Sequence, residues 1–174
     1  MTVSGAIPLI ETARLRLRAP GAGDFAVVAP FLASDRARFI GGPHDRDRAW
    51  AKFAASAGAW VLQGFGYWAL EERASGRIAG AVGFQHPPAF AEKELGWGLH
   101  DGFEGRGYAT EAAAAARDWW FRARGETTLV SYIDRGNARS IRVAERLGAR
   151  RDSAATGPDP EDLVFRHPRP EIRP

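Results

Sequence analysis

The stretch FEGRGYATEAAAAARDWWF, residues 103–121, runs from a glycine-rich turn directly into an alanine-rich helix. Glycine costs about 1 kcal/mol relative to alanine inside a helix, so Gly105 and Gly107 at the start of this one need a reason. An open turn at the positive end of a helix dipole leaves backbone N–H groups converging on one point, which makes an anion site. A tight connection without a ligand is the alternative. Arg106, Thr110 and the strand pattern before the turn favour a bound phosphate.

Composition and charge narrow the class of protein. The chain has 174 residues, of which 45% are hydrophobic and 26% charged, as is typical of a soluble globular protein. We therefore predict a single domain over residues 1–174, with a core of about 10–166 and a flexible tail at 167–174. The net charge is only +3 and the arginines are spread along the chain, so no nucleic-acid partner is predicted.

Several kinds of site are excluded by what the chain lacks. It has no cysteine, which excludes disulfides, thiolate metal sites and a cysteine nucleophile. Its histidines show no metal-ligand spacing, so no metal is predicted. No apolar run is long enough to cross a bilayer, and the first residues lack the pattern of a secretory signal peptide. These patterns predict a cytoplasmic protein without a membrane partner.

Hydrophobic periodicity and turn residues predict a mixed α/β fold. Strands are expected within 12–20, at 93–99, 127–133 and 163–167, and as a hairpin across 66–85. Helices are expected from Asp24, as its cap, to about 32, from 47 to about 62, from 107 to 122, and from Asn137 to about 147. The segment RFIGGPHD, residues 38–45, is interpreted as a loop.

Three stretches together make a family resemblance: EGRGYA at 104–109, KELGWGL at 93–99 and NARSIRVAERLGA at 137–149. They resemble the GNAT superfamily of acyl-CoA-dependent N-acyltransferases, and more narrowly its ribosomal-protein N-terminal acetyltransferase branch. The resemblance covers residues from about 10 to 166, beginning with IETARLRLRAP. The family's loop pattern, Gln/Arg-x-x-Gly-x-Gly/Ala, falls on Glu104, Gly105, Arg106, Gly107, Tyr108 and Ala109. Glu104 departs from the pattern and brings an acid close to the anion.

The resemblance implies a GNAT-like α/β fold, in which a twisted, mixed and mostly antiparallel sheet is flanked by helices. A V-shaped split would separate two central strands, at 93–99 and 127–133. Acetyl-CoA is the implied co-substrate, and the amides of residues 104–109 would wrap its pyrophosphate, with Thr110 in the first helical turn. The backbone of Trp97, Gly98 and Leu99 and the side chain of Asn137 would hold the pantetheine arm. Transfer should be direct, because no cysteine exists to carry the acyl group.

Acyl transfer to an amine requires a base for the attacking ammonium. Glu94 is the candidate, because it lies on the strand before the loop, where some family members place a catalytic glutamate. Packing against Trp97 and Phe84 would raise its pKa toward neutrality. An exposed strand carboxylate in a charged patch is the alternative, and the sequence leaves both interpretations open.

Asn137 and Ser140 form an N-x-x-S pattern at the start of a helix. From the residues alone they are interpreted as an N-cap and a surface serine. By resemblance, Ser140 lies near the thioester sulfur and assists the leaving thiolate. Many family members carry a tyrosine for that role seven residues after the asparagine, where this chain has Ala144.

The amine side of the site is the least determined part of the prediction. The branch uses its early helices and the loop after the third strand there, which points to Phe39, His44, Trp50, Phe84 and Phe90. We predict an N-acetyltransferase for a primary amine, with a protein N-terminal α-amine slightly ahead of a small-molecule amine. A non-catalytic acyl-CoA-binding sensor is the alternative. Relatives are often monomers or dimers, and a homodimer is weakly favoured.

Overall fold

The structure, a computed structural model, describes residues 6–170. The strands are β1 (Ile10–Glu11), β2 (Leu15–Arg18), β3 (Tyr67–Glu72), β4 (Ile78–Gln85), β5 (Glu94–Leu99), β6 (Val130–Asp134), β7 (Arg150–Arg151) and β8 (Asp162–Arg166). The α-helices are α1 (Phe25–Leu32), α2 (Arg46–Gln63), α3 (Tyr108–Ala123) and α4 (Ala138–Arg146), and η1 (Ala22–Asp24) and η2 (Asp35–Ile40) are 3₁₀ helices. All strands belong to one sheet in the order β1-β2-β3-β4-β5-β6-β8-β7.

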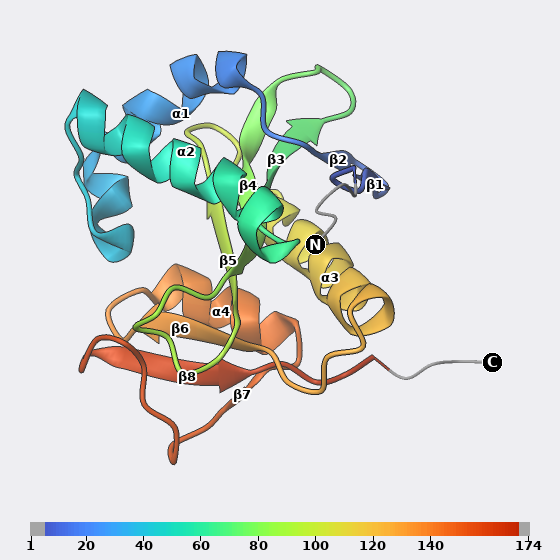
Figure 1. Ribbon diagram of the computed structural model, residues 1–174, viewed down its shortest axis with the longest axis vertical. Coiled ribbons are helices and arrows are strands. Elements are labelled where there is room, and N and C mark those ends of the chain that lie inside the picture. The colour runs from blue at the N-terminus through green and yellow to red at the C-terminus, as the bar shows by residue number, and fades with distance from the viewer. Residues whose placement is uncertain (1–5, 171–174) are drawn as a thin grey trace.

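The sheet is antiparallel except at its centre, where β5 and β6 run parallel. These two strands share only the residue pair Glu94–Val130, so they separate toward their C-terminal ends. Figure 1 shows the two halves that result, with β1–β4, α1 and α2 in the upper part and β6–β8 with α4 in the lower part. The predicted mixed α/β fold with a V-shaped split between two central strands is confirmed.

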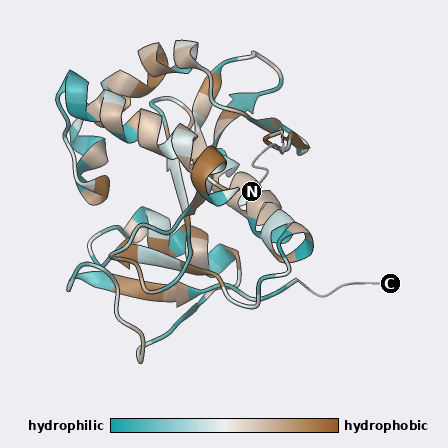
Figure 2. Cartoon of the chain, in the orientation of Figure 1, coloured by the Kyte–Doolittle hydropathy of each residue, from teal (hydrophilic) through white to brown (hydrophobic). Residues whose placement is uncertain are grey.

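Helix α3 packs over one face of the sheet, and its alanines explain how closely it does so. Ala112, Ala113 and Ala116 are completely buried against the strands. At the end of the helix, the ring of Trp120 lies 4.3 Å from that of Phe84, centroid to centroid. In Figure 2 the hydrophobic colour also marks β6 and β8 beneath α4, which belong to a second buried cluster.

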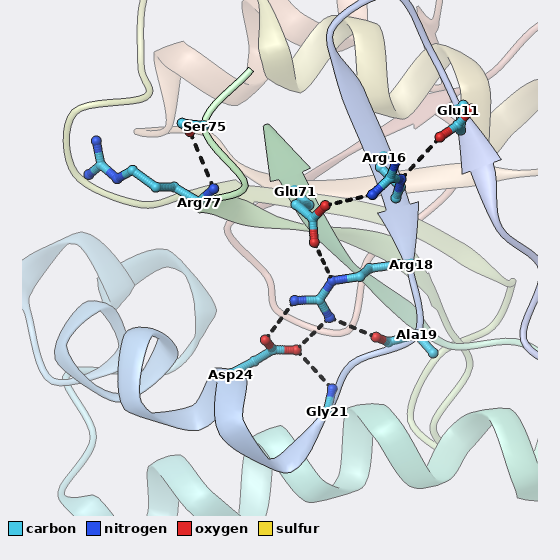
Figure 3. Close-up of polar contacts among 9 residues, drawn as sticks. All are labelled: Glu11, Arg16, Arg18, Ala19, Gly21, Asp24, Glu71, Ser75 and Arg77. Atoms are coloured by element: carbon cyan, nitrogen blue, oxygen red, sulfur yellow. Dashed lines mark hydrogen bonds and ion pairs between the residues drawn. The ribbon is translucent and has the colours of Figure 1, made fainter. Parts of the chain in front are cut away.

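Helices α1 and α2 pack against each other, and a cavity separates them from β3–β6. An arginine network fixes where α1 begins (Figure 3): Arg18 donates to both oxygens of Asp24, at 2.9 and 2.8 Å, and to Glu71 on β3, at 2.8 Å. Asp24 also accepts the N–H of Gly21 at 2.8 Å. Its carboxylate therefore ties the helix to β2 and β3, and does not form the side-chain cap on α1 that the sequence predicted.

The predicted helices and longer strands are confirmed, and four short elements were missed: η1, η2, β1 and β7. Helix η2 begins before the predicted loop at 38–45 and covers its first residues, while β1 and β7 are two-residue strands that pair with β2 and β8. Elements this short carry no measurable periodicity.

The predicted tail begins too early. His167 is only 4% exposed, and its N–H donates to the carbonyl of Leu129 at 2.9 Å. The last part of the predicted tail, residues 171–174, lies outside the described residues. Among residues 6–170, no helix has both the length and the apolar character required to span a membrane.

Candidate active site

The glycine-rich turn enters α3 with its backbone open. Gly105 and Gly107 have φ values of +75° and +80°, in the left-handed region that favours glycine. Gly107 is the N-cap residue of α3, and no side chain supplies a capping hydrogen bond there. The first N–H groups of α3, at the positive end of the helix dipole, therefore have no side-chain cap.

Side chains behind the turn hold it in place. Tyr108 Oη donates to Glu72 on β3 at 2.5 Å, and Arg106 pairs with the same carboxylate at 3.2 Å. Arg14 donates to the carbonyl oxygen of Arg106 at 2.8 Å and pairs with Glu111 at 2.6 Å. The Arg106 side chain thus lies against Glu72, away from the open side of the turn.

A cavity of about 1150 Å³, the loop cavity, opens beside the turn. Nearly all of the residues predicted to bind the cofactor line it: Trp97, Gly98, Leu99, Glu104, Gly105, Gly107, Tyr108, Ala109, Thr110 and Asn137. Arg106 is the exception, because its side chain is held by Glu72. The structure therefore brings the end of β5, the turn and the start of α4 to one opening.

Glu104, the departure from the family loop pattern, is paired with an arginine from η2. Arg36 Nη2 lies 2.6 Å from the Glu104 carboxylate and donates to the carbonyl of Leu99 at 2.9 Å. The same guanidinium also bonds Asp101 and lines the loop cavity. Arg36 thus offsets the charge of Glu104 beside the opening, where the family pattern allows an arginine within the loop itself.

A second cavity, of about 640 Å³, lies between β3–β6 and the helices α1, η2 and α2, and we call it the strand cavity. It meets the loop cavity at the split, where Trp97, Gly98, Asn137 and Ser140 line both. A molecule in one cavity can therefore touch a molecule in the other through the opening between β5 and β6.

Glu94 lies in the wall of the strand cavity and is only 7% exposed. Gln85 Nε2 donates to one carboxylate oxygen, and the N–H of Tyr132 donates to the other at 3.3 Å. Burial raises the pKa of Glu94 to about 7, against the opposing effects of Gln85, Tyr132 and the Lys52 ammonium. A carboxyl group that titrates near neutral pH inside a cavity is suited to proton transfer.

Ser140 reaches the split from the first turn of α4. The N-cap residue Asn137 accepts the N–H of Ser140 through Oδ1 at 3.2 Å, so the asparagine does cap the helix. Ser140 is half-buried and lines both cavities. The structure thus places Ser140 at the split and Glu94 within the strand cavity. Their chemical roles stay predictions.

The residues predicted for the amine side are only partly brought together. Phe39 and Phe90 line the strand cavity. The placement of Phe84 there is wrong: it is completely buried against Trp119 and Trp120 on the α3 face, because residues alternate along β4.

His44 and Trp50 lie outside both cavities. Trp50 is 47% exposed and packs edge-on against Phe25. The ring of His44 lies against the turn at Gly41 and Gly42. Neither residue contributes to the wall that the sequence assigned to it.

Sequence reasoning missed several cavity residues, namely Arg36, Lys52, Tyr67 and Gln85. Gln85 is the cross-strand partner of Glu94, and the alternation along β4 would have selected it over Phe84 once the register was known. Lys52 had a weak signal, because lysine is rare in this arginine-rich chain. Arg36 and Tyr67 had none, since their positions depend on contacts between distant segments.

Within the described part of the chain, no group of three or more His, Asp or Glu side chains is placed to hold a metal ion. A family profile described as acetyltransferase (GNAT) domain matches residues 14–150. The crystal structure of an acetyltransferase from Agrobacterium tumefaciens str. C58 is 42% identical, with a TM-score of 0.90, over 97% of this chain and 99% of that one.

Two further comparisons are more distant. The uncharacterized protein YkkB of Bacillus subtilis (strain 168) is 36% identical over 87 residues, 49% of this chain and 51% of YkkB, so the match spans about half the length of that curated relative. A putative ribosomal-protein-serine acetyltransferase from Vibrio cholerae shares the fold, with a TM-score of 0.72 at 23% identity over 92% of this chain and 97% of that one. This chain thus shares its fold with a protein described as a ribosomal-protein acetyltransferase.

Proposed function

The chain belongs to the GNAT acetyltransferase family, and on this premise we propose that it transfers the acetyl group of acetyl-CoA directly to a primary amine. The observation that carries the proposal is the junction of the two cavities at the split, with the open glycine turn on one side and buried Glu94 on the other. Acetyl-CoA would bind in the loop cavity and the amine in the strand cavity.

The free edge of β5 supports this arrangement. The carbonyl of Leu95 points toward β6, where it accepts a hydrogen bond from Ser131 Oγ at 2.6 Å. Backbone direction alternates along a strand, so the N–H of Trp97 points the same way, and β6 has separated by that point. A pantetheine arm can pair with this edge as a missing strand would, and the Trp97 N–H can stabilise the tetrahedral oxyanion.

The pKa of Glu94 favours an amine of modest basicity. Deprotonating an α-amine of pKa near 8 costs about 1 kcal/mol at pH 7, whereas a lysine near 10.4 costs roughly 4 to 5 kcal/mol. With a pKa of about 7, Glu94 can take the α-amine proton, directly or through water, at little energetic cost. We therefore favour the α-amine of a protein N-terminus or of a small molecule.

The acceptor nitrogen then attacks the thioester carbon, a C–N bond forms, the C–S bond breaks, and the coenzyme A thiolate takes up a proton. Ser140 is suited to hydrogen-bond the sulfur as this charge develops, because it lines both cavities. No covalent enzyme intermediate through sulfur is available, since the chain has no cysteine.

An amine panel tests the proposal. The protein is incubated with acetyl-CoA and with peptides bearing free N-termini, lysine derivatives, polyamines and small α-amines, while free thiol is measured and products are identified by mass. We expect thiol release with an N-acetylated product, fastest for α-amines. Binding of acetyl-CoA without thiol release for any amine would instead indicate a non-catalytic sensor. The cytoplasmic location, the homodimer and the absence of a nucleic-acid partner stay predictions.

A further inference from the structure

Resting on the proposed function, we propose that Tyr67 belongs to the acceptor site and that its hydroxyl hydrogen-bonds the attacking amine beside Glu94. Tyr67 is the first residue of β3 and lines the strand cavity. Neither the family loop pattern nor the N-x-x-S pattern includes it.

The register of three strands places this hydroxyl. Tyr67 pairs with Gly83 on β4, and Gly83 pairs with Gly96 on β5. With strands about 4.8 Å apart, the Tyr67 and Gly96 backbones are separated by about 10 Å, so the side chain has to extend across β4. The side chain does reach β5: a Cβ added to Gly96 would lie 2.1 Å from Tyr67 Oη. The absence of a side chain at Gly96 leaves room for the hydroxyl end of the ring.

This position lies next to the candidate base. Glu94 and Gly96 are two residues apart on β5, so they face the same side of the sheet at a separation of about 7 Å. Glu94, Gly96 and Tyr67 all line the strand cavity. The start of β3 is held in place by Trp60, whose Nε1 donates to the Tyr67 carbonyl at 3.0 Å.

Tyr67 also differs from the other tyrosines in its hydrogen bonding. Tyr108 Oη donates to Glu72, and Tyr132 Oη accepts the N–H of Glu92 at 3.1 Å. For the Tyr67 hydroxyl, residues 6–170 provide no hydrogen-bond partner. A polar group that faces a cavity without a protein partner is available to a ligand.

The chemistry suits a positioning contact. Burial and, second, the nearby Glu94 carboxylate raise the pKa of Tyr67 well above its usual value, so the hydroxyl stays neutral at the working pH. After one ammonium proton has passed to Glu94, the hydroxyl can accept an N–H of the neutral amine and hold the nitrogen with its lone pair toward the split. Tyr67 itself neither gains nor loses a proton in this step.

The first test is Tyr67→Phe, which keeps the ring and removes only the oxygen. With the best amine of the panel, we expect the amine kcat/KM to fall about 10- to 30-fold, and the Kd of acetyl-CoA to stay within about 2-fold. Thermal unfolding checks that the variant folds. A kcat/KM within about 2-fold of wild type, in a folded variant, would overturn the inference.

The second test uses Gly96→Ala in a double-mutant cycle. The new methyl group would displace the hydroxyl, so Gly96→Ala alone should lower kcat/KM at least as much as Tyr67→Phe. In the Tyr67→Phe background the oxygen at 2.1 Å is gone and the nearest ring atom lies at 3.2 Å, so the same change should cost much less. Additive effects would indicate two independent packing defects and would contradict the proposal.

The two proposals fail in different ways. A wild-type protein that releases no thiol with any amine refutes the proposed function. Wild-type turnover that Tyr67→Phe retains refutes only the role of Tyr67 and leaves the acetyltransferase function standing.

Discussion

The two cavities on either side of the split share residues where they meet, but they differ in the groups expected to hold a ligand. The loop cavity is lined by the glycine turn with the first residues of α3, by the end of β5, by α4 with the residues just before it, and by side chains of α1 and η2. The strand cavity takes side chains from α1, η2, α2, β3, β4, β5 and β6. The pyrophosphate contacts expected in the loop cavity are backbone groups of one local motif, whereas the base and the acceptor contacts expected in the strand cavity are side chains that only the complete fold assembles.

This difference determines which substitutions should matter. Where main-chain N–H groups hold a ligand, replacing a side chain should have little effect unless it changes the backbone path. Where one buried side chain carries the chemistry, removing its functional group should stop the reaction. The predictions below test this contrast in order of decreasing effect.

Glu94→Gln should cause the largest loss, a fall in kcat of about 100- to 1,000-fold with the Kd of acetyl-CoA nearly unchanged. In wild type, kcat/KM for the amine should rise with pH through about 7 and then level, because burial raises the Glu94 pKa to about 7 and only the carboxylate is a base. Thiol-release assays from pH 5.5 to 9 measure the kcat of the variant and the pH dependence of kcat/KM in wild type. A variant that keeps the wild-type rate and pH profile would remove Glu94 from the mechanism.

The same change should increase stability at alkaline pH. The folded pKa of Glu94 lies above its usual value of 4.5. The contribution of this group to the free energy of unfolding is therefore fully present below about pH 4.5 and is lost as the pH rises through about 7. The loss amounts to roughly 3 kcal/mol, which Glu94→Gln should largely recover at pH 8. Glu92→Gln is the matched control: this carboxylate bonds Arg166 at 2.8 and 2.9 Å, so its loss should lower Tm and leave the pH–rate profile unchanged.

Gly107→Val should be the most damaging change in the loop cavity. At φ +80° a β-branched residue is strained, and relieving the strain moves the amides that face the ligand. We expect the Kd of acetyl-CoA to rise on the order of 100-fold by calorimetry.

Gly125→Val is its matched control, because Gly125 follows the other end of α3 with φ +64° and open space around it. It should lower Tm by a similar amount and leave the Kd within about 2-fold. An unaffected Kd in Gly107→Val would show that the turn is only a connector.

This contrast also explains what the sequence could predict. The turn, α3, the N-cap at Asn137 and the candidate base are local patterns, and the structure places them around the split. Phe84 was misplaced because neighbouring residues on a strand face opposite sides, and the sequence did not specify which side of β4 faces the cavity. Arg36 lies far from Glu104 in the chain, and Tyr67 reaches Gly96 only through the register of β3, β4 and β5. No local pattern contains such contacts.

Arg36→Ala should raise the Kd of acetyl-CoA about 10-fold, because it leaves the Glu104 carboxylate unpaired beside the expected phosphates. Glu104→Gln in that background should recover most of the loss, while Glu104→Gln alone should change the Kd by less than about 3-fold. Calorimetry on the three variants gives the coupling between the two residues. A double variant as weak as Arg36→Ala would instead assign the effect to the bonds that Arg36 makes with Asp101 and with the Leu99 carbonyl.

Arg106→Ala should have the smallest effect, although this arginine lies at the centre of the motif. Its side chain is 51% exposed and pairs with Glu72 at 3.2 Å, and exposed ion pairs contribute about 0 to 1 kcal/mol. The N–H of residue 106 survives the substitution, so the Kd of acetyl-CoA should rise less than about 3-fold, and its dependence on salt should match that of wild type. Loss of binding, or a flatter salt dependence, would mean that the guanidinium leaves Glu72 to contact a phosphate. The loop cavity would then depend on a side chain in the way that the strand cavity does.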